Sequence, residues 1–290
     1  MRTKTFLLFL LLPLMSFAQD TDDIGVTFVG LQRDFAGVTL NYRKANIESN
    51  TSDSKALVIY LHGGSSCGTD NTTQMKESGI ESIANYLVDN QMSAVFMVPQ
   101  CPDRTKGWGG MAKNVKALLD FTAQTEGIDM NRIYIFGGSM GGTGTWKMLS
   151  TYPNYFAAGM PCAANPKGMS AENIATTPVY SVMGLADNIM NSDVRAIAED
   201  FISQLQQLGG EAKYETVEGW THETTCTQSY TAERLDWIFS HIKAETNAID
   251  TIHNDETRSD DAWYTLQGIR VAQPLPAGLY IHNGKKMVVR

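Results

Sequence analysis

Hydrophobic and polar positions follow two alternating patterns along most of the chain, from about residue 26 to residue 244. Short apolar runs, typical of buried strands, alternate with stretches in which apolar residues recur every three or four positions, typical of amphipathic helices. The run ALVIYL at 56–61 is almost wholly apolar, as a strand covered on both faces must be. The alternation predicts an α/β domain with a mostly parallel central sheet and helices on both of its faces.

Individual strands and helices can be assigned from this pattern. Residues 26–32 and 38–43 are expected to form a leading antiparallel pair around a turn at 34–37. Further strands are expected at 56–61, 93–98, 132–136, 156–160, 179–183 and 212–217, with helices at 79–89, 111–126, 143–150, 194–208 and 232–243. No internal repeat is evident, and we expect one main domain at residues 24–244.

The N-terminal residues differ from this domain in composition. Arg2 and Lys4 precede an apolar run at 6–14, and small residues follow at 16 and 18. This order predicts a secretory signal peptide over residues 1–18.

The C-terminal residues also depart from the alternating pattern. Residues 245–261 are polar and acidic and predict a linker. The segment 262–290 contains two strand-like stretches, at 263–271 and 278–289, and the second holds an Asn-Gly pair at 283–284. This pair between apolar residues is a strong signal for a two-residue turn, so a short β-hairpin tail is predicted.

The charge balance restricts the partners of the protein. The chain carries 31 acidic and 23 basic residues, a net charge of −8. This charge disfavours nucleic acid and anionic lipid surfaces as partners and fits a neutral or polymeric substrate better than a polyanion. After the signal peptide no apolar stretch approaches the roughly 18 residues of a membrane span, and none is expected.

The four cysteines are Cys67, Cys101, Cys162 and Cys226. In an exported protein an even number of cysteines favours disulfides, and three pairings are possible. We expect Cys67 to pair with Cys101 and Cys162 with Cys226, because each follows a predicted strand end. No C-x-x-C spacing indicates zinc or redox chemistry, and no metal or other cofactor is predicted.

The run IYIFGGSMGG at 133–142 carries the clearest candidate chemistry. A buried strand leads directly into a G-x-S-x-G turn around Ser139, with a helical stretch behind it, which is the arrangement that exposes a nucleophilic serine. Gly137 and Gly141 allow the tight approach that this turn requires. The alternatives are a glycine-rich turn without chemical consequence, or a phosphate loop, which would need a lysine just before Ser or Thr.

A nucleophilic serine needs a base and an acid, which in this arrangement follow it along the chain as Asp or Glu and then His. His222 lies in a loop after the last predicted core strand, although a surface-loop histidine is the alternative. Asp187 follows the strand at 179–183 directly and is favoured as the acid. Asp193 is the rival, although it could simply belong to a helix cap.

Hydrolysis also needs two N–H groups aimed at the oxyanion of the tetrahedral intermediate. Met140 follows the nucleophile and is expected to supply one. The second is expected from the H-G-G stretch after the strand at 56–61, from Gly64 or otherwise Ser65. Trp108 lies in a Gly-flanked loop and is predicted to contact substrate, with core packing as the alternative.

Five segments of the chain carry a family resemblance: LHGGSSCGTDN, VPQCPDRTKGW, GGSMGGTGTW, GLADN and GWTHE. Over roughly residues 55–243 they resemble secreted α/β-hydrolase esterases related to feruloyl and acetyl xylan esterases, polyhydroxybutyrate depolymerases and prolyl-oligopeptidase-like peptidases. The resemblance implies an α/β-hydrolase fold, the triad Ser139, Asp187 and His222, and a loop carrying Trp108 near the site.

The same resemblance suggests the reaction. It implies a serine carboxylic ester hydrolase acting on acetyl or feruloyl esters of plant polysaccharide, although no lid segment or aromatic cluster marks a phenolic pocket. A serine peptidase and a non-catalytic surface binding protein on a hydrolase fold are the alternatives.

The tail YTLQGIRVAQPLPAGLYIHNGKKMVVR carries a second resemblance. It is similar to C-terminal sorting modules of the type IX secretion route, with Gly268, Gly278 and Gly284-Lys285 at the matching positions. The resemblance implies export through the periplasm to the medium or the cell surface, with the secretion machinery as partner of the tail.

Overall fold

The computed structural model describes residues 25–49 and 54–243, together with the short segments 263–265, 270–271, 278–282 and 285–289. The chain divides into two compact units, residues 1–244 and 245–290, each with its own sheet. The predicted signal peptide and linker lie outside the described residues. In the part of the chain that is described, no helix is long and apolar enough to cross a membrane.

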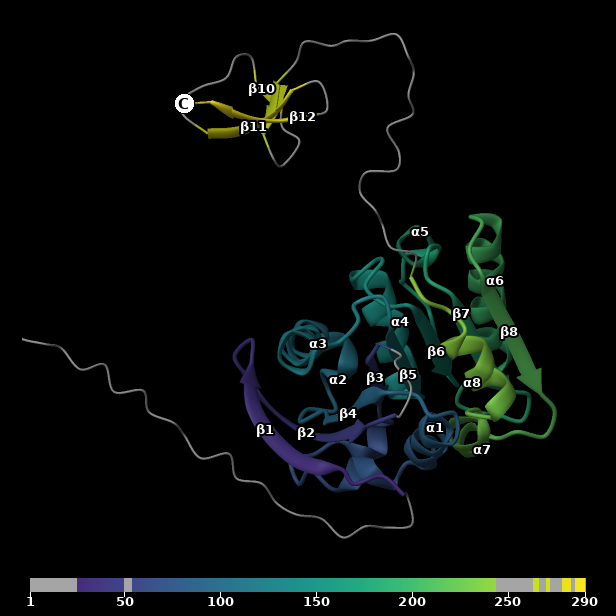
Figure 1. Cartoon of the computed structure of the whole chain (residues 1–290). Coiled ribbons are helices and arrows are strands. Elements are labelled where there is room, and N and C mark those ends of the chain that lie inside the picture. Colours follow the sequence, from purple (N-terminus) through teal and green to yellow (C-terminus); the bar gives the residue numbers. More distant parts are fainter. Residues whose placement is uncertain are drawn as a thin grey trace, which may run out of the picture. The chain divides into compact units, whose positions relative to one another are not determined.

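The first unit is built on an eight-stranded sheet with the order β1-β2-β4-β3-β5-β6-β7-β8 (Figure 1). Strands β1 and β2 pair antiparallel, as do β2 and β4, and all later neighbours pair parallel. The strands are β1 (Val29–Phe35), β2 (Val38–Ile47), β3 (Ala56–Leu61), β4 (Ala94–Gln100), β5 (Ile133–Gly138), β6 (Ala158–Cys162), β7 (Val179–Gly184) and β8 (Ala212–Val217). This order confirms the α/β-hydrolase fold expected from the sequence.

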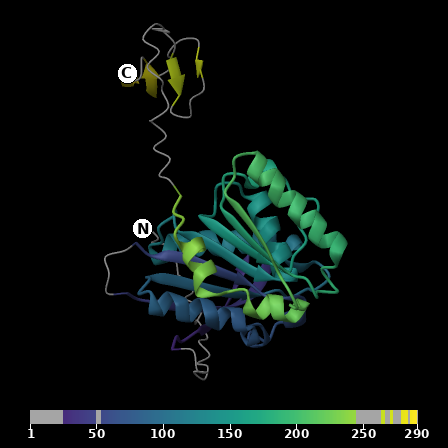
Figure 2. The ribbon, with the colours of Figure 1, turned by 90° about the vertical axis from the view of Figure 1, so that its right-hand side faces the viewer.

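Helices cover both faces of this sheet (Figures 1 and 2). Apolar residues of α3, α4 and α6 pack in one core with alternate residues of β3, such as Leu57 and Ile59, while those of α1 and α8 pack with Val58 and Tyr60 on the other face. The helices are α1 (Ser78–Asp89), α2 (Gly107–Gly110), α3 (Ala112–Glu126), α4 (Met140–Thr151), α5 (Ala171–Ile174), α6 (Ser192–Gln207), α7 (His222–Gln228) and α8 (Ala232–Phe239), with 3-10 turns η1 (Gly64–Ser66) and η2 (Thr73–Lys76). All six residues of β3 are buried, which is why this strand reads as a continuous apolar run.

Three local predictions need correction. The first strand was expected at 26–32 before a turn at 34–37, but β1 runs from Val29 to Phe35, and Asp34 and Phe35 still pair with β2, so the turn holds only Ala36 and Gly37. His222 was expected in a loop, but it is the first residue of α7, whose sequence HETTCTQ is too polar to show an apolar period. The final helix was expected to extend to residue 243, but α8 ends at Phe239.

The predicted disulfide pairing is also wrong, because all four cysteines are free. The Cys67 sulfur lies 3.9 Å from the Met140 sulfur, and the Cys101 thiol donates to the Asp103 carbonyl at 3.4 Å. Burial raises the pKa of the Cys101 thiol to about 12 and that of Cys162 to about 11.

The second unit contains a four-stranded antiparallel sheet with the order β10-β9-β11-β12. Its strands are β9 (Trp263–Thr265), β10 (Arg270–Val271), β11 (Gly278–His282) and β12 (Lys285–Val289). His282 pairs with Lys285 at the end of the β11–β12 ladder, which leaves two residues for the turn, as the Asn-Gly signal predicted. The turn residues themselves lie outside the described residues.

Candidate active site

Ser139 occupies a strained turn between β5 and α4. Its backbone has φ 57° and ψ −120°, a sparsely populated conformation with positive φ that costs a serine about 1–3 kcal/mol. The flanking glycines make the turn possible, because a Cβ on Gly141 would lie 1.7 Å from the Leu61 carbonyl oxygen and one on Gly137 would lie 2.5 Å from the Gly141 backbone. The result is a serine hydroxyl presented at the carboxyl edge of the sheet.

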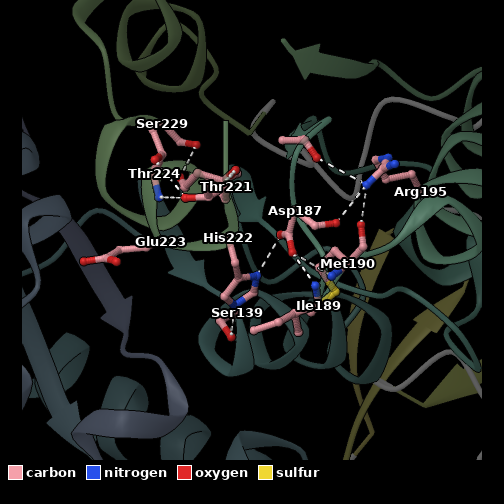
Figure 3. A network of polar contacts seen from close by, with 12 residues as sticks. Ser139, Asp187, Ile189, Met190, Arg195, Thr221, His222, Glu223, Thr224 and Ser229 are labelled. Carbon is pink, nitrogen blue, oxygen red and sulfur yellow. Dashed lines mark hydrogen bonds and ion pairs between the residues drawn. The ribbon is translucent and has the colours of Figure 1, made fainter. Parts of the chain in front are cut away.

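Ser139, His222 and Asp187 form a continuous chain of hydrogen bonds, and their side chains point toward one another in Figure 3. The His222 Nε2 lies 2.8 Å from Ser139 Oγ, and His222 Nδ1 lies 2.7 Å from Asp187 Oδ2. A carboxylate accepts, so the ring proton belongs on Nδ1 and leaves Nε2 free to accept the serine proton. This is the geometry of a nucleophile with its general base and an orienting acid.

Asp187 is held in place from two sides after the end of β7. Its second carboxylate oxygen, Oδ1, accepts the N–H groups of Ile189 and Met190, both at 2.8 Å. Arg195 in α6 donates to the backbone carbonyls of Asp187 at 3.1 Å and Met190 at 2.7 Å (Figure 3). The Asp187 side chain is buried, so both oxygens are satisfied by fixed partners.

Asp193, the rival acid, does not reach the histidine. It lies exposed in the first turn of α6, where the helix dipole stabilises a negative charge. The helix cap is Asn191, whose side chain accepts the Val194 N–H at 3.2 Å. Of the two carboxylates, the structure therefore places only Asp187 against His222.

The loop before His222 is fastened directly to the loop that carries Asp187. The Ala186 N–H donates to the Trp220 carbonyl at 3.0 Å. Gly184 permits this approach, because a Cβ there would lie 2.2 Å from the Trp220 oxygen. Thr221 then starts α7 by accepting the Thr224 N–H at 3.3 Å. Acid and base are thus positioned relative to each other by backbone contacts.

The stretch from His62 to Ser66, called here the oxyanion loop, passes beside the nucleophile. A Cβ on Gly63 would lie 3.9 Å from the Ser139 Cβ. The Gly63 N–H donates to Glu77 at 2.7 Å, so it is already engaged, and Gly64 is the next backbone donor along the loop. Met140 starts α4, whose N-terminal dipole favours negative charge at this point. Both predicted oxyanion donors therefore belong to segments next to Ser139.

His62 joins the oxyanion loop to the chain after β4. Its Nε2 accepts the Cys101 N–H at 2.9 Å, and its Nδ1 lies 2.7 Å from the Gly63 carbonyl oxygen, to which it donates in the neutral tautomer. Burial lowers the pKa of His62 to about 4. A neutral His62 therefore satisfies both neighbours and acts as a structural link in the loop.

Trp108 lies beneath the oxyanion loop. Its side chain is 1% exposed, and its indole N–H donates to the His62 carbonyl at 2.9 Å. A Cβ on Gly144 would lie 2.4 Å from the Trp108 Cβ, which shows how closely α4 packs against it. This burial corrects the preference for substrate contact, because the ring fills core instead of facing a ligand.

Sequence reasoning did not single out Glu77 and Arg195, the charged residues that hold these loops. Glu77 reads as an ordinary acidic residue at a helix start, and Arg195 as an ordinary polar residue on an amphipathic helix. Their roles arise from contacts across the fold, which no local pattern reports. No group of three or more His, Cys, Asp or Glu side chains suited to a metal ion occurs among the described residues.

Known proteins with related sequences include esterases. The chain is 28% identical to feruloyl esterase B of Neurospora crassa over 130 residues, which is 42% of this chain and 44% of that protein. It is 38% identical to acetylxylan esterase A of Emericella nidulans over 64 residues, 22% of this chain and 21% of that protein. The chain thus matches less than half the length of these relatives.

A similar fold occurs in the crystal structure of a thermostable esterase, with a TM-score of 0.66 at 24% identity over 74% of this chain and 63% of that one. Residues 42–233, well over half of the chain, match the model of one family. The chain therefore belongs to the phospholipase/carboxylesterase family.

Proposed function

We propose that this protein is a secreted serine hydrolase that cleaves carboxylic esters, with acetyl or feruloyl esters on plant polysaccharide as its substrates. The observation that carries the proposal is the hydrogen-bonded chain from Ser139 through His222 to Asp187, beside a glycine loop that can receive an oxyanion. Membership of a carboxylesterase family supports the ester specificity. The names of the relatives, a feruloyl esterase and an acetylxylan esterase, support the acyl groups.

The first half of the reaction forms an acyl-enzyme. His222 Nε2 takes the hydroxyl proton of Ser139 as Oγ attacks the ester carbon, and Asp187 stabilises the resulting imidazolium. The carbonyl oxygen becomes an oxyanion that accepts hydrogen bonds from the N–H groups of Met140 and Gly64. Collapse of this intermediate expels the alcohol, which leaves with the proton held by His222.

The second half repeats these steps with water. His222, now neutral again, takes a proton from water as the water oxygen attacks the acyl carbon. The same two N–H groups hold the second oxyanion. Its collapse releases the carboxylic acid, and the proton returns from His222 to Ser139.

A fluorophosphonate probe followed by a panel of acyl esters and peptides tests this proposal. We expect labelling of the mature protein at Ser139, none of the Ser139→Ala variant, and turnover of acetyl or feruloyl esters in the panel. Turnover of peptides instead would assign a serine peptidase. An unlabelled and inactive wild type would refute the hydrolase proposal and favour a binding protein.

We further propose that residues 1–18 direct export and that residues 262–290 engage an outer-membrane secretion machinery. The order of charged, apolar and small residues at the start supports the first part, and the glycine pattern of the tail supports the second. Deleting residues 262–290 should leave active enzyme in the periplasm. Normal export of the truncated form would refute the role of the tail.

A further inference from the structure

The oxyanion loop contributes to the proposed site through its backbone, so its position must be set by other groups. Two of its members donate to one carboxylate oxygen: the Gly63 N–H at 2.7 Å and the Ser66 hydroxyl at 2.8 Å both reach Glu77 Oε1. These two contacts lie on either side of Gly64 in the chain. One oxygen atom of Glu77 therefore fixes the segment that carries the proposed oxyanion donor.

Glu77 is oriented toward this loop and away from its own helix. It occupies the N-cap position of α1, yet its side chain makes no capping hydrogen bond to that helix. Its other oxygen, Oε2, accepts the Tyr60 hydroxyl at 3.0 Å from the end of β3. The carboxylate thus links the strand before the loop, the loop itself and the start of α1.

Close packing brings the start of α1 to this position. Gly79, two residues after Glu77, touches the rings of Tyr60 and Tyr230, and a Cβ there would lie 2.4 Å from Tyr230 Cε2. A side chain at position 79 would push the helix, and the carboxylate with it, away from the loop. The glycine therefore belongs to the arrangement that lets Glu77 reach Gly63.

The carboxylate is held without a neutralising cation. Across residues 25–49 and 54–243, none of the ion pairs involves Glu77. Burial raises the pKa of Glu77, although its three hydrogen bonds act in the opposite direction. Glu77 is half-buried and has no counter-charge, so its carboxylate depends on the three hydrogen bonds from Gly63, Ser66 and Tyr60, which an apolar residue at this position could not accept.

We propose that Glu77 is a positioning residue for the oxyanion hole: by holding Gly63 and Ser66 it sets the direction of the Gly64 N–H group. This inference rests on the proposed ester hydrolysis and deepens it. Glu77 touches no reacting atom. Its effect falls on the transition state, where the oxyanion exists, and hardly on the bound substrate.

Three substitutions at position 77 separate the effect of side-chain length from the effect of negative charge. Glu77→Gln keeps the length of the side chain, and its amide oxygen can still accept from Gly63 and Ser66. Glu77→Asp keeps the charge but is one methylene shorter, so it loses contact with the loop. Glu77→Ala removes both. We expect kcat to fall about 10- to 100-fold in the Asp and Ala variants, with KM within about threefold, and to stay within about fivefold of wild type in the Gln variant.

The inhibition constant of a trifluoromethyl ketone is a measurement that would not change if Glu77 had only a structural role. It adds to the catalytic serine as a tetrahedral oxyanion, so its inhibition constant should rise with the loss in kcat across the three variants. Asn114→Ala is the matched control, because Asn114 is buried and its side-chain amide donates to the Phe35 carbonyl at 2.7 Å, away from the hydrogen bonds of the loop. It should lower the melting temperature without changing kcat or inhibitor affinity.

The outcomes are distinct for this inference and for the proposed function. An active wild type whose Asp and Ala variants keep kcat and lose only melting temperature would overturn the role of Glu77 alone. If Ala fails to fold, the Asp and Gln pair decides, and a Gln variant worse than Asp would overturn it too. A wild type without hydrolysis or fluorophosphonate labelling would overturn both proposals together.

Discussion

The two sides of the candidate site are held in opposite ways. On one side, the His222 side chain faces Ser139 and the Asp187 side chain faces His222. Backbone groups contribute to their positions: the Asp187 carboxylate accepts two N–H groups, and the loops of acid and base are joined by an N–H to carbonyl hydrogen bond. On the other side, the oxyanion loop offers backbone N–H groups, and the side chains of His62 and Glu77 position it.

This difference follows from which groups are left for chemistry. A side chain that takes part in the reaction must be positioned by other groups, and on this side main-chain groups do so. Where main-chain N–H groups serve the reaction, side chains must fix their direction, here His62 within the loop and Glu77 at the start of α1. Substitutions on the first side should therefore act on the reaction itself, and those on the second should act through geometry and stability.

The largest effect is expected for Ser139→Ala. Loss of the nucleophile should lower kcat/KM for an acyl ester by about 10⁴-fold or more while leaving the fold intact. Because nucleophile and base act as one unit, the double variant with His222→Ala should lose little further activity, measured under the same conditions. Additive losses would contradict a shared mechanism.

Asp187→Asn ranks next. The amide cannot hold the ring proton on Nδ1 as a carboxylate does, so kcat should fall about 10³- to 10⁴-fold at unchanged substrate affinity. Asp193→Asn serves as the matched control, because Asp193 is exposed and does not contact His222. If the Asp193 variant lost the greater share of activity, the assignment of the acid would be reversed.

The lowered pKa of His62 predicts a pH dependence of the free energy of unfolding that originates on the oxyanion side. Its pKa is lowered by burial from 6.5 to about 4, so the folded protein keeps it neutral while the unfolded chain takes up a proton below pH 6.5. The free energy of unfolding should therefore be unaffected by His62 above pH 6.5 and fall by about 3 kcal/mol as the pH approaches 4. Urea unfolding of wild type and His62→Gln between pH 4 and 7 measures this, and the variant should lack that part of the pH dependence.

The sequence predicted the fold well, because strands buried on both faces and amphipathic helices leave strong local patterns. It also selected Ser139, Asp187 and His222 by motif and chain order, and the structure brings these side chains within hydrogen-bond distance. It missed α7, whose start depends on Thr221 and not on an apolar period. It missed the role of Glu77 as well, because only packing between elements decides which way a carboxylate at a helix start will point.

Arg195 adds a side-chain support to the backbone contacts that hold the acid. Arg195→Ala removes the donors to the carbonyls of Asp187 and Met190, and the loosened loop should lower kcat about tenfold with little change in KM. Lys116→Ala is a suitable control, since Lys116 pairs with Asp120 within α3 and the carboxylate of its partner belongs to the same helix. An Arg195 variant with wild-type kcat would show that the hydrogen bonds from the Ile189 and Met190 N–H groups to the Asp187 carboxylate are enough to position it.

The smallest effect is expected for Trp108→Phe, which distinguishes packing from substrate binding on the oxyanion side. The variant loses the N–H bond to the His62 carbonyl and part of the ring, which should cost about 1–3 kcal/mol of stability. Because the side chain is buried beneath the loop, KM should stay within about twofold of wild type. Thermal unfolding and steady-state kinetics on the same preparation measure both quantities. A raised KM at unchanged melting temperature would instead place the ring in the substrate pocket, and the oxyanion side would then bind substrate through a side chain as well as through its backbone.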